Sequence, residues 1–368
     1  RIFLFSDTTL AMVLHDTSAQ KLELTGRMAH LHAELTALLQ GQDAENEPVP
    51  QLRIGAATLD AGLGLGREAA SSLRNISLAL RGSDNAVQIF PRSFAQKAQA
   101  DEYARRMLVE WIRLGTPPLH YQPKFSLRDM RIVGGEALLR CVDEQGAPLP
   151  PPYLLEIAER HRLLPGLEWS TVQAVVRDLR RMDRSIIDIG LAVNLSAVSF
   201  VTAGFGERLV ALLADQGVAP NRLSIEVMET SKVPSIDIVQ HNFDILRHSG
   251  VKLSLDDFGN GYAALTTLAL YPFREVKIDR WMVASIGQPR IRQAIALAAE
   301  SAKRYGAELV IEGIETEEQR RTLLDMGIET GQGFLCSPSL PLEGFTALVS
   351  RARPHGVPGP AHARIEPV

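Results

Sequence analysis

From Leu119 onward, the chain alternates between short apolar runs and longer amphipathic stretches. The runs are rich in Leu, Ile and Val, and most of them end in a polar side chain. Such runs are typical of buried parallel strands that present a group at their carboxyl ends. The clearest of them occupy residues 132–139, 191–194, 223–226, 252–257, 275–278, 309–312 and 331–334.

The stretches between these runs repeat apolar positions at helical spacing. They predict helices at residues 151–162, 168–183, 204–216, 234–248, 262–270, 290–305, 316–326 and 342–352. Eight strands that alternate with helices favour an α/β fold of the closed (β/α)8, TIM-like barrel type over an open, doubly wound sheet. In such a barrel the strand ends meet at one rim, where enzymes of this architecture carry their chemistry.

The first 91 residues show a shorter α/β pattern, with strands predicted at 10–14, 52–59 and 86–90 and a helix at about 67–80. Another helix is predicted by an apolar stripe made of Leu24, Met28, Leu31, Leu35 and Leu38. We therefore expect four parts along the chain. They are an N-terminal α/β domain (1–91), a helical connector (92–115), the barrel (116–352) and a disordered tail rich in Pro, Gly and Ala (353–368).

The composition of the chain excludes some classes of function. The chain has 368 residues, 45% of them hydrophobic, which is enough for a barrel and a smaller module. The formal net charge of -4 gives no basic footprint, so neither DNA nor RNA is expected as a partner. No apolar stretch reaches the length of a membrane span. The chain begins at Arg1 without a methionine, so we expect a cytoplasmic fragment whose full-length protein carries a sensor or membrane anchor upstream.

The polar residues at the strand ends are mostly acidic. Glu136, Asn194, Glu226 and Asp256 end four successive predicted strands, and oxygen donors of this kind suit Mg²⁺ or Mn²⁺. So many carboxylates at one rim need cations among them to stay ionised. The Asp256-Asp257 pair suits two ions about 4 Å apart, the geometry of two-metal phosphoryl chemistry, and Glu312 would complete the second site. Each acid taken singly would more often be a solvated surface group.

Three further residues belong to the same pattern. Lys277 is the lone cation on the strand between the acids, where it can hold a water or help to deprotonate it. Arg140 can grip a phosphate or stack on a base; its alternative is a salt bridge at the barrel rim. Glu229 can fix the glycine loop at 257–262, or it is an exposed acid at a helix start.

Cys141 and Cys336 form no disulfide framework and no zinc spacing.

Read in order, these motifs resemble the EAL-domain phosphodiesterases of bacterial cyclic di-GMP signalling. The resemblance covers roughly residues 103–350. It is carried by Tyr121-Gln-Pro, Glu136-Ala-Leu-Leu-Arg140, Asn194-Leu-Ser, Glu226-Val-Met-Glu229-Thr, Asp256-Asp-Phe-Gly-Asn-Gly-Tyr, Lys277-Ile-Asp-Arg, Glu312-Gly-Ile-Glu-Thr and Gln332-Gly-Phe. It implies a barrel whose first strand runs antiparallel, and hydrolysis of cyclic di-GMP to linear pGpG with two Mg²⁺ or Mn²⁺ ions.

The resemblance also implies roles for individual residues. Lys277 and Gln332 would position the attacking water, Glu312 would take part in catalysis, and Glu229 would brace the glycine loop. Gln122 and Arg140, with Glu136, would contact the substrate. The metal ligands would be Glu136, Asn194, Glu226, Asp256, Asp257 and Glu312. A homodimer is a further expectation from the family.

Residues 1–91 resemble, more weakly, the later half of a GGDEF domain. The signature position falls at Ser6-Asp-Thr-Thr-Leu10, which lacks the Gly-Gly turn and the acidic pair of an active cyclase. We therefore expect an inactive regulatory module. The main alternative function for the whole chain is a receptor that captures cyclic di-GMP without cleaving it, and a third is a scaffold that binds no nucleotide.

Overall fold

The structure is a computed structural model of the chain. It describes residues 2–6, 9–12, 21–40, 52–57, 76–77, 87–90, 92–143, 146–184, 187, 189–228, 236–258 and 264–351. Several predictions fall outside these residues: most of the helix at 67–80, the brace by Glu229, most of the glycine loop and the tail from residue 353. The chain forms two compact units, Arg1–Met107 and Leu108–Val368, and each is described by itself.

The first unit contains two small pairs of strands and a long helix. Strands β1 (Ile2–Ser6) and β2 (Thr9–Met12) pair antiparallel, and β3 (Ile54–Ala57) pairs parallel with β4 (Val87–Phe90). Helix α1 (Lys21–Gln40) buries Met28 of the predicted stripe. Helix α3 (Arg92–Leu114) begins in this unit and ends in the second. The resemblance of the unit to a GGDEF domain stays a prediction.

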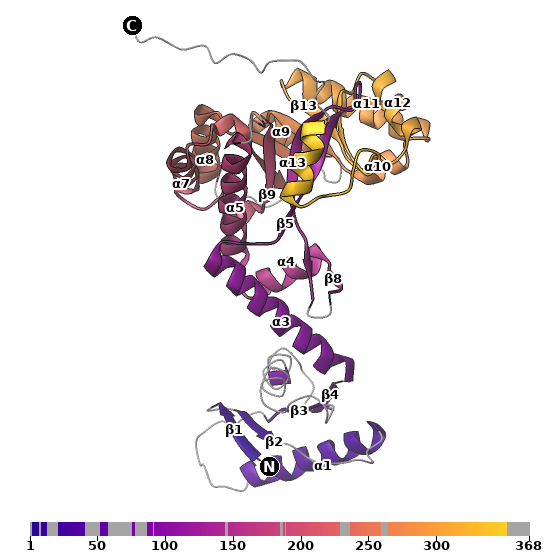
Figure 1. The fold of residues 1–368 in the computed structure, drawn as a ribbon. Helices are drawn as coiled ribbons and strands as arrows, with labels where there is room; N and C mark the ends of the chain where they lie inside the picture. Colours follow the sequence, from indigo (N-terminus) through magenta and orange to yellow (C-terminus); the bar gives the residue numbers. More distant parts are fainter. Residues whose placement is uncertain are drawn as a thin grey trace. The chain divides into compact units, whose positions relative to one another are not determined.

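The second unit is a closed eight-stranded barrel, which confirms the predicted TIM-like architecture (Figure 1). The strands follow one another around the barrel in the order β10-β11-β12-β13-β14-β5-β6-β9. In chain order they are β5 (Leu119–Ser126), β6 (Ile132–Leu139), β9 (Gly190–Leu195), β10 (Leu223–Met228), β11 (Lys252–Phe258), β12 (Glu275–Ile278), β13 (Glu308–Ile311) and β14 (Thr330–Gln332). The first strand, β5, is antiparallel to both of its neighbours, β6 and β14, as the resemblance implied.

Helices follow the strands at the positions that the apolar spacing predicted. They are α4 (Pro151–Arg160), α5 (Leu164–Arg184), α7 (Phe205–Gln216), α8 (Ile236–Ser249), α9 (Ala264–Leu270), α11 (Pro289–Arg304), α12 (Glu317–Asp325) and α13 (Leu342–Arg351). A short hairpin pairs β7 (Cys141–Val142) with β8 (Pro148–Leu149), and a single 3₁₀ turn occupies Pro220–Arg222. No helix within the described ranges is long and apolar enough to cross a membrane.

Two short helices were not predicted, because four or five residues are too few to show a period. Helix α6 (Ala197–Phe200) follows β9, and its N-cap Ser196 accepts a hydrogen bond from the backbone of Ser199. Helix α10 (Arg280–Ala284) follows β12, and its N-cap Asp279 accepts from the backbone of Trp281 at 2.8 Å. Both caps satisfy free N–H groups of a helix start. Each of these helices thus begins two residues after a strand ends.

The strands separate an apolar outer face from a charged interior. In β12, Val276 and Ile278 are fully buried in the apolar core between barrel and helices. Glu275 and Lys277 alternate with them and so point to the inside. The same period places Tyr121 and Phe125 of β5 in the apolar core, and Gln122 and Lys124 inside. The interior of this barrel is consequently lined by ionisable side chains.

Gly135 of β6 has no room for a side chain. A Cβ atom at Gly135 in β6 would lie 2.5 Å from Cζ of Phe345, a fully buried residue of α13. This close approach lets the last helix lie directly on the strand. Helix α13 thereby covers the part of the barrel wall where the first strands pack.

Candidate active site inside the barrel

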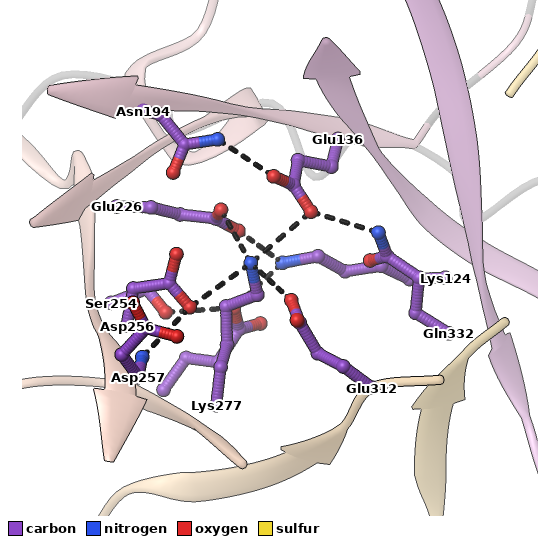
Figure 2. A network of polar contacts seen from close by, with 11 residues as sticks. Lys124, Glu136, Asn194, Glu226, Ser254, Asp256, Asp257, Lys277, Glu312 and Gln332 are labelled. Carbon is purple, nitrogen blue, oxygen red and sulfur yellow. Dashed lines mark hydrogen bonds and ion pairs between the residues drawn. The ribbon is translucent and has the colours of Figure 1, made fainter. Parts of the chain in front are cut away.

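Lys277 lies at the centre of a cluster of carboxylates (Figure 2). Its ammonium nitrogen is 2.6 Å from Glu312 Oε1 and 2.7 Å from Glu226 Oε2. It is also 3.1 Å from Glu136 Oε2 and 3.3 Å from Asp256 Oδ1. The side chain of Lys277 is only 1% exposed, and the four acids come from four different segments of the barrel. The structure therefore brings together the separate strand-end residues that the sequence singled out.

Glu136 is held by two amides as well as by Lys277. Asn194 donates from Nδ2 to Glu136 Oε1 at 2.6 Å, and Gln332 donates from Nε2 to Glu136 Oε2 at 2.8 Å. Burial opposes the charge of Glu136, but Lys277, Lys124 and the two amides outweigh burial and lower its pKa to about 2. The other amide atom of Gln332, Oε1, is buried without a hydrogen-bond partner. An acceptor is thus left free beside the acids.

Sequence reasoning missed Lys124, the second cation of the site. Its Nζ lies 2.8 Å from Glu226 Oε1 and 2.6 Å from Glu275 Oε1. Ser254 donates to the same oxygen of Glu275 at 2.9 Å. Sequence reasoning also missed Ser254 and Glu275, yet the sequence contained a signal for all three residues. Each stands two positions from a residue that was identified: Lys124 from Gln122, Ser254 from Asp256 and Glu275 from Lys277. A strand period of two puts them on the same inward face.

Acids outnumber cations in this network. Five carboxylates, those of Glu136, Glu226, Asp256, Glu275 and Glu312, contact two ammonium groups, those of Lys124 and Lys277. Burial, together with the charge of Glu136, raises the pKa of Glu226 to about 8. Burial likewise raises the pKa of Glu312 to about 7. The site as it stands therefore favours protons or further positive charge.

The two carboxyl groups of the Asp256-Asp257 pair have different partners. Asp256 faces Lys277, whereas the carboxyl group of Asp257 hydrogen-bonds that of Asp279. Asp257 has a positive φ of 56°, unusual for a residue other than glycine, and its N–H donates to Asp256 Oδ1 at 3.0 Å. Burial and the charge of Asp256 raise the pKa of Asp257 to about 6. Strain of this kind is common where a strand ends beside a functional site.

The predicted substrate contacts lie beside this cluster. Gln122 in β5 is the register partner of Glu136, and it is half-buried. Arg140 follows β6 and donates to Ser339 Oγ at 3.2 Å and to the carbonyl of Leu139 at 2.8 Å. The role of Arg140, as a substrate contact or as a salt bridge at the rim, stays a prediction. Both cysteines, Cys141 and Cys336, are free thiols.

The donor atoms of the cluster fit a hard divalent cation, because they are carboxylate and amide oxygens. The buried, unpartnered Oε1 of Gln332 adds to this set. In the arrangement described here, however, no group of three or more His, Cys, Asp or Glu side chains within the described ranges is placed to hold a metal ion. The carboxylates surround the ammonium group of Lys277 instead. The metal and its ligands stay a prediction.

Comparison with known proteins gives a consistent match to the second unit. The family model for the EAL domain matches residues 105–339. The cyclic di-GMP phosphodiesterase RocR of Pseudomonas aeruginosa is 31% identical over 227 residues, which cover 61% of this chain and 58% of RocR. The bifunctional diguanylate cyclase/cyclic di-GMP phosphodiesterase MucR of the same species is 33% identical, over 63% of this chain and 34% of MucR.

A solved structure shows the same likeness. The PaMucR phosphodiesterase in complex with c-di-GMP superimposes with a TM-score of 0.59 at 30% identity, covering 65% of this chain and 99% of that one. The chain spans only 58% and 34% of the length of the two curated relatives, so the match concerns one part of those proteins.

Proposed function

This chain belongs to the EAL domain family, and we propose that its barrel is a cyclic di-GMP phosphodiesterase that releases linear pGpG. The observation that carries the proposal is the convergence of Glu136, Glu226, Asp256 and Glu312 on Lys277. Similarity to RocR, a cyclic di-GMP phosphodiesterase, supports the choice of substrate. So does the likeness to the PaMucR phosphodiesterase, whose structure contains c-di-GMP.

The proposed reaction is a hydrolysis. A water oxygen gives up a proton and forms a bond to phosphorus, the bond from phosphorus to the 3′ oxygen breaks, and a proton equal to the one given up is delivered to that oxygen, which leaves as a hydroxyl group. Lys277 would hold the water with its ammonium group, and Gln332 would keep Glu136 in place through the bond at 2.8 Å. Glu312 has a pKa raised to about 7, so it can accept the proton of the water near neutral pH.

We further propose that two Mg²⁺ or Mn²⁺ ions serve this reaction. The ligands would be Glu136, Asn194, Glu226, Asp256, Asp257 and Glu312. Asn194 uses its NH₂ group for Glu136, which leaves its Oδ1 as the atom for a cation. When bound, such ions supply positive charge that activates a water and stabilises the charge on a phosphate. Lys277 would then share the carboxylates that surround it here.

Gln122 and Arg140 would contact the substrate at the edge of the cluster. Gln122 is the register partner of Glu136, so a ligand that reaches Glu136 passes beside it. Arg140 is tied to Ser339 through Nε, which leaves its Nη2 amino group to donate to a phosphate or base. Glu229 would brace the glycine loop.

For residues 1–91 we propose an inactive GGDEF-like module with a regulatory or dimerising role. The support is the sequence at Ser6-Asp-Thr-Thr-Leu10, which offers neither a Gly-Gly turn nor an acidic pair. A homodimer of the chain is a further proposal, which comes from the resemblance to the EAL family alone, and sedimentation of the purified chain would test it.

Turnover of cyclic di-GMP by the 368-residue chain tests the main proposal. The chain would be incubated with the dinucleotide and Mn²⁺, or with EDTA, and the products separated by chromatography. We expect pGpG with Mn²⁺ and none with EDTA. Bound but uncleaved dinucleotide would identify a receptor instead, and absence of binding in calorimetry would leave only the scaffold function.

A further inference from the structure

Three neighbouring strands, β10, β11 and β12, contribute one layer of polar side chains to the barrel interior, next to Lys277. Glu226 in β10 is the register partner of Ser254 in β11, and Ser254 is the partner of Glu275 in β12. Lys124 reaches this layer from β5 and contacts both of its acids. The proposed reaction uses Glu226, but it assigns no task to the other three residues.

The two oxygens of Glu226 have different partners. Oε1 accepts from Lys124 at 2.8 Å, and Oε2 accepts from Lys277 at 2.7 Å (Figure 2). Glu226 is completely buried, and the side chain of Lys124 is only 6% exposed. Water therefore does not compete for these bonds, and the carboxylate plane is fixed by its two cations.

Lys124 is itself anchored on the side away from Glu226. Its second carboxylate, Glu275, is held in turn by the hydroxyl of Ser254 at 2.9 Å. A cation that is held between two buried carboxylates is suited to orienting one of them, because the other carboxylate keeps it in place.

We propose that Lys124, anchored by Glu275 and Ser254, is a positioning residue that turns Glu226 so that only Oε2 faces the reaction site. The proposal rests on the proposed function, since it concerns the orientation of a proposed metal ligand. Groups that orient metal ligands commonly affect metal affinity tenfold to a hundredfold. The competing explanation is that Lys124 only neutralises buried charge and affects stability alone.

Metal binding in the absence of substrate separates the two explanations. Mn²⁺ would be titrated into the 368-residue chain and followed by electron paramagnetic resonance, with the melting temperature recorded for each variant. The variants are Lys124→Met/Glu275→Gln, which removes the ammonium group together with the charge of its anchor, and Lys124→Arg, which keeps a cation. Glu275→Gln retains an acceptor for Ser254. Lys303→Met, at an exposed lysine of α11, is the matched control.

We expect Lys124→Met/Glu275→Gln to bind Mn²⁺ at least about tenfold more weakly than the wild type. Its kcat should fall while its KM for cyclic di-GMP stays within about twofold, because Lys124 contacts the Glu226 oxygen that does not face Lys277. Lys124→Arg should recover most of the affinity, and Lys303→Met should match the wild type. A folded double variant that binds Mn²⁺ as the wild type does would overturn the inference and leave the proposed function intact.

Two other outcomes are also decisive. If the double variant shows no melting transition, the single variant Glu275→Gln takes its place, and unchanged Mn²⁺ binding by that variant would overturn the inference. A wild-type chain that binds no Mn²⁺ and cleaves no cyclic di-GMP would overturn the proposed function and this inference with it.

Discussion

Lys277 and Glu312 face each other at 2.6 Å across the ends of two neighbouring strands, β12 and β13. Lys277 is fully buried, whereas Glu312 is the most exposed of the four acids around it. Because Glu312 stands at the open side of the cluster, it is the acid best placed to exchange a proton with a water.

Replacing Glu312 by Gln should therefore lower kcat by at least about a hundredfold and change KM little, since Gln keeps the shape of the side chain but removes both the proton acceptor and the charge of a proposed metal ligand. Steady-state kinetics with Mn²⁺ would measure both constants. Glu308→Gln, at an exposed position of the same strand, is the control and should retain full activity. Turnover by Glu312→Gln within twofold of wild type would remove Glu312 from the reaction.

Glu136 should be indispensable for turnover but not for folding. Glu136→Ala removes the acceptor of Asn194, Gln332 and Lys277, yet Lys277 keeps three other carboxylates. We expect no detectable pGpG by chromatography and an unchanged circular dichroism spectrum. Retained cleavage in the presence of Mg²⁺ or Mn²⁺ would refute its assignment as a ligand.

Metal affinity should rise with pH through neutrality. The pKa of Glu312 is raised to about 7, so a cation must displace a proton from this carboxyl group below that pH. Calorimetric titration with Mn²⁺ at pH 6, 7 and 8 should give progressively tighter binding, with proton release that shrinks as the pH increases. Affinity that is flat over this range would show that Glu312 is not protonated in the cation-free protein.

The stability of the cation-free protein should change in the opposite direction. A carboxyl group whose pKa is higher in the folded state than in the unfolded state binds more protons when folded, so its contribution is lost as the pH rises through the folded pKa. For Glu312 this window runs from about pH 4.5 to about pH 7. Melting temperatures with EDTA should fall across it, and Glu312→Gln should show a smaller fall.

A fifth prediction concerns the contact between Gly135 and Phe345. Gly135→Ala places a methyl group about where the Phe345 ring lies, so we expect a loss of about 1–3 kcal/mol in the free energy of unfolding. Phe345→Leu in the same chain should recover part of this loss, because the shorter side chain leaves room. Urea denaturation of the single and double variants would measure the coupling. If the changes in the free energy of unfolding of the two single variants simply add in the double variant, Gly135 and Phe345 are not in contact.

The sequence predicted the barrel and the central acids because both depend on local pattern. A run such as that ending at Glu226 identifies a buried strand by itself, and the closed barrel then brings the ends together. Partners across the interior are different. Lys124 and Glu275 are 151 positions apart, so the period of each strand indicates that both side chains point inward but does not indicate that they meet. The reversed direction of β5 likewise came only from the resemblance to a family.

The pairing of β5 with β14 has a consequence for synthesis on the ribosome. β5 meets β6 as soon as both have left the exit tunnel, but its other edge is filled only by residues 330–332. At typical rates of translation, roughly 10–40 s separate the two. During that interval the nascent chain carries an unpaired strand edge, which is a template for association with other chains. Production of this protein should therefore depend on chaperones that shield an incomplete barrel until its last strand arrives.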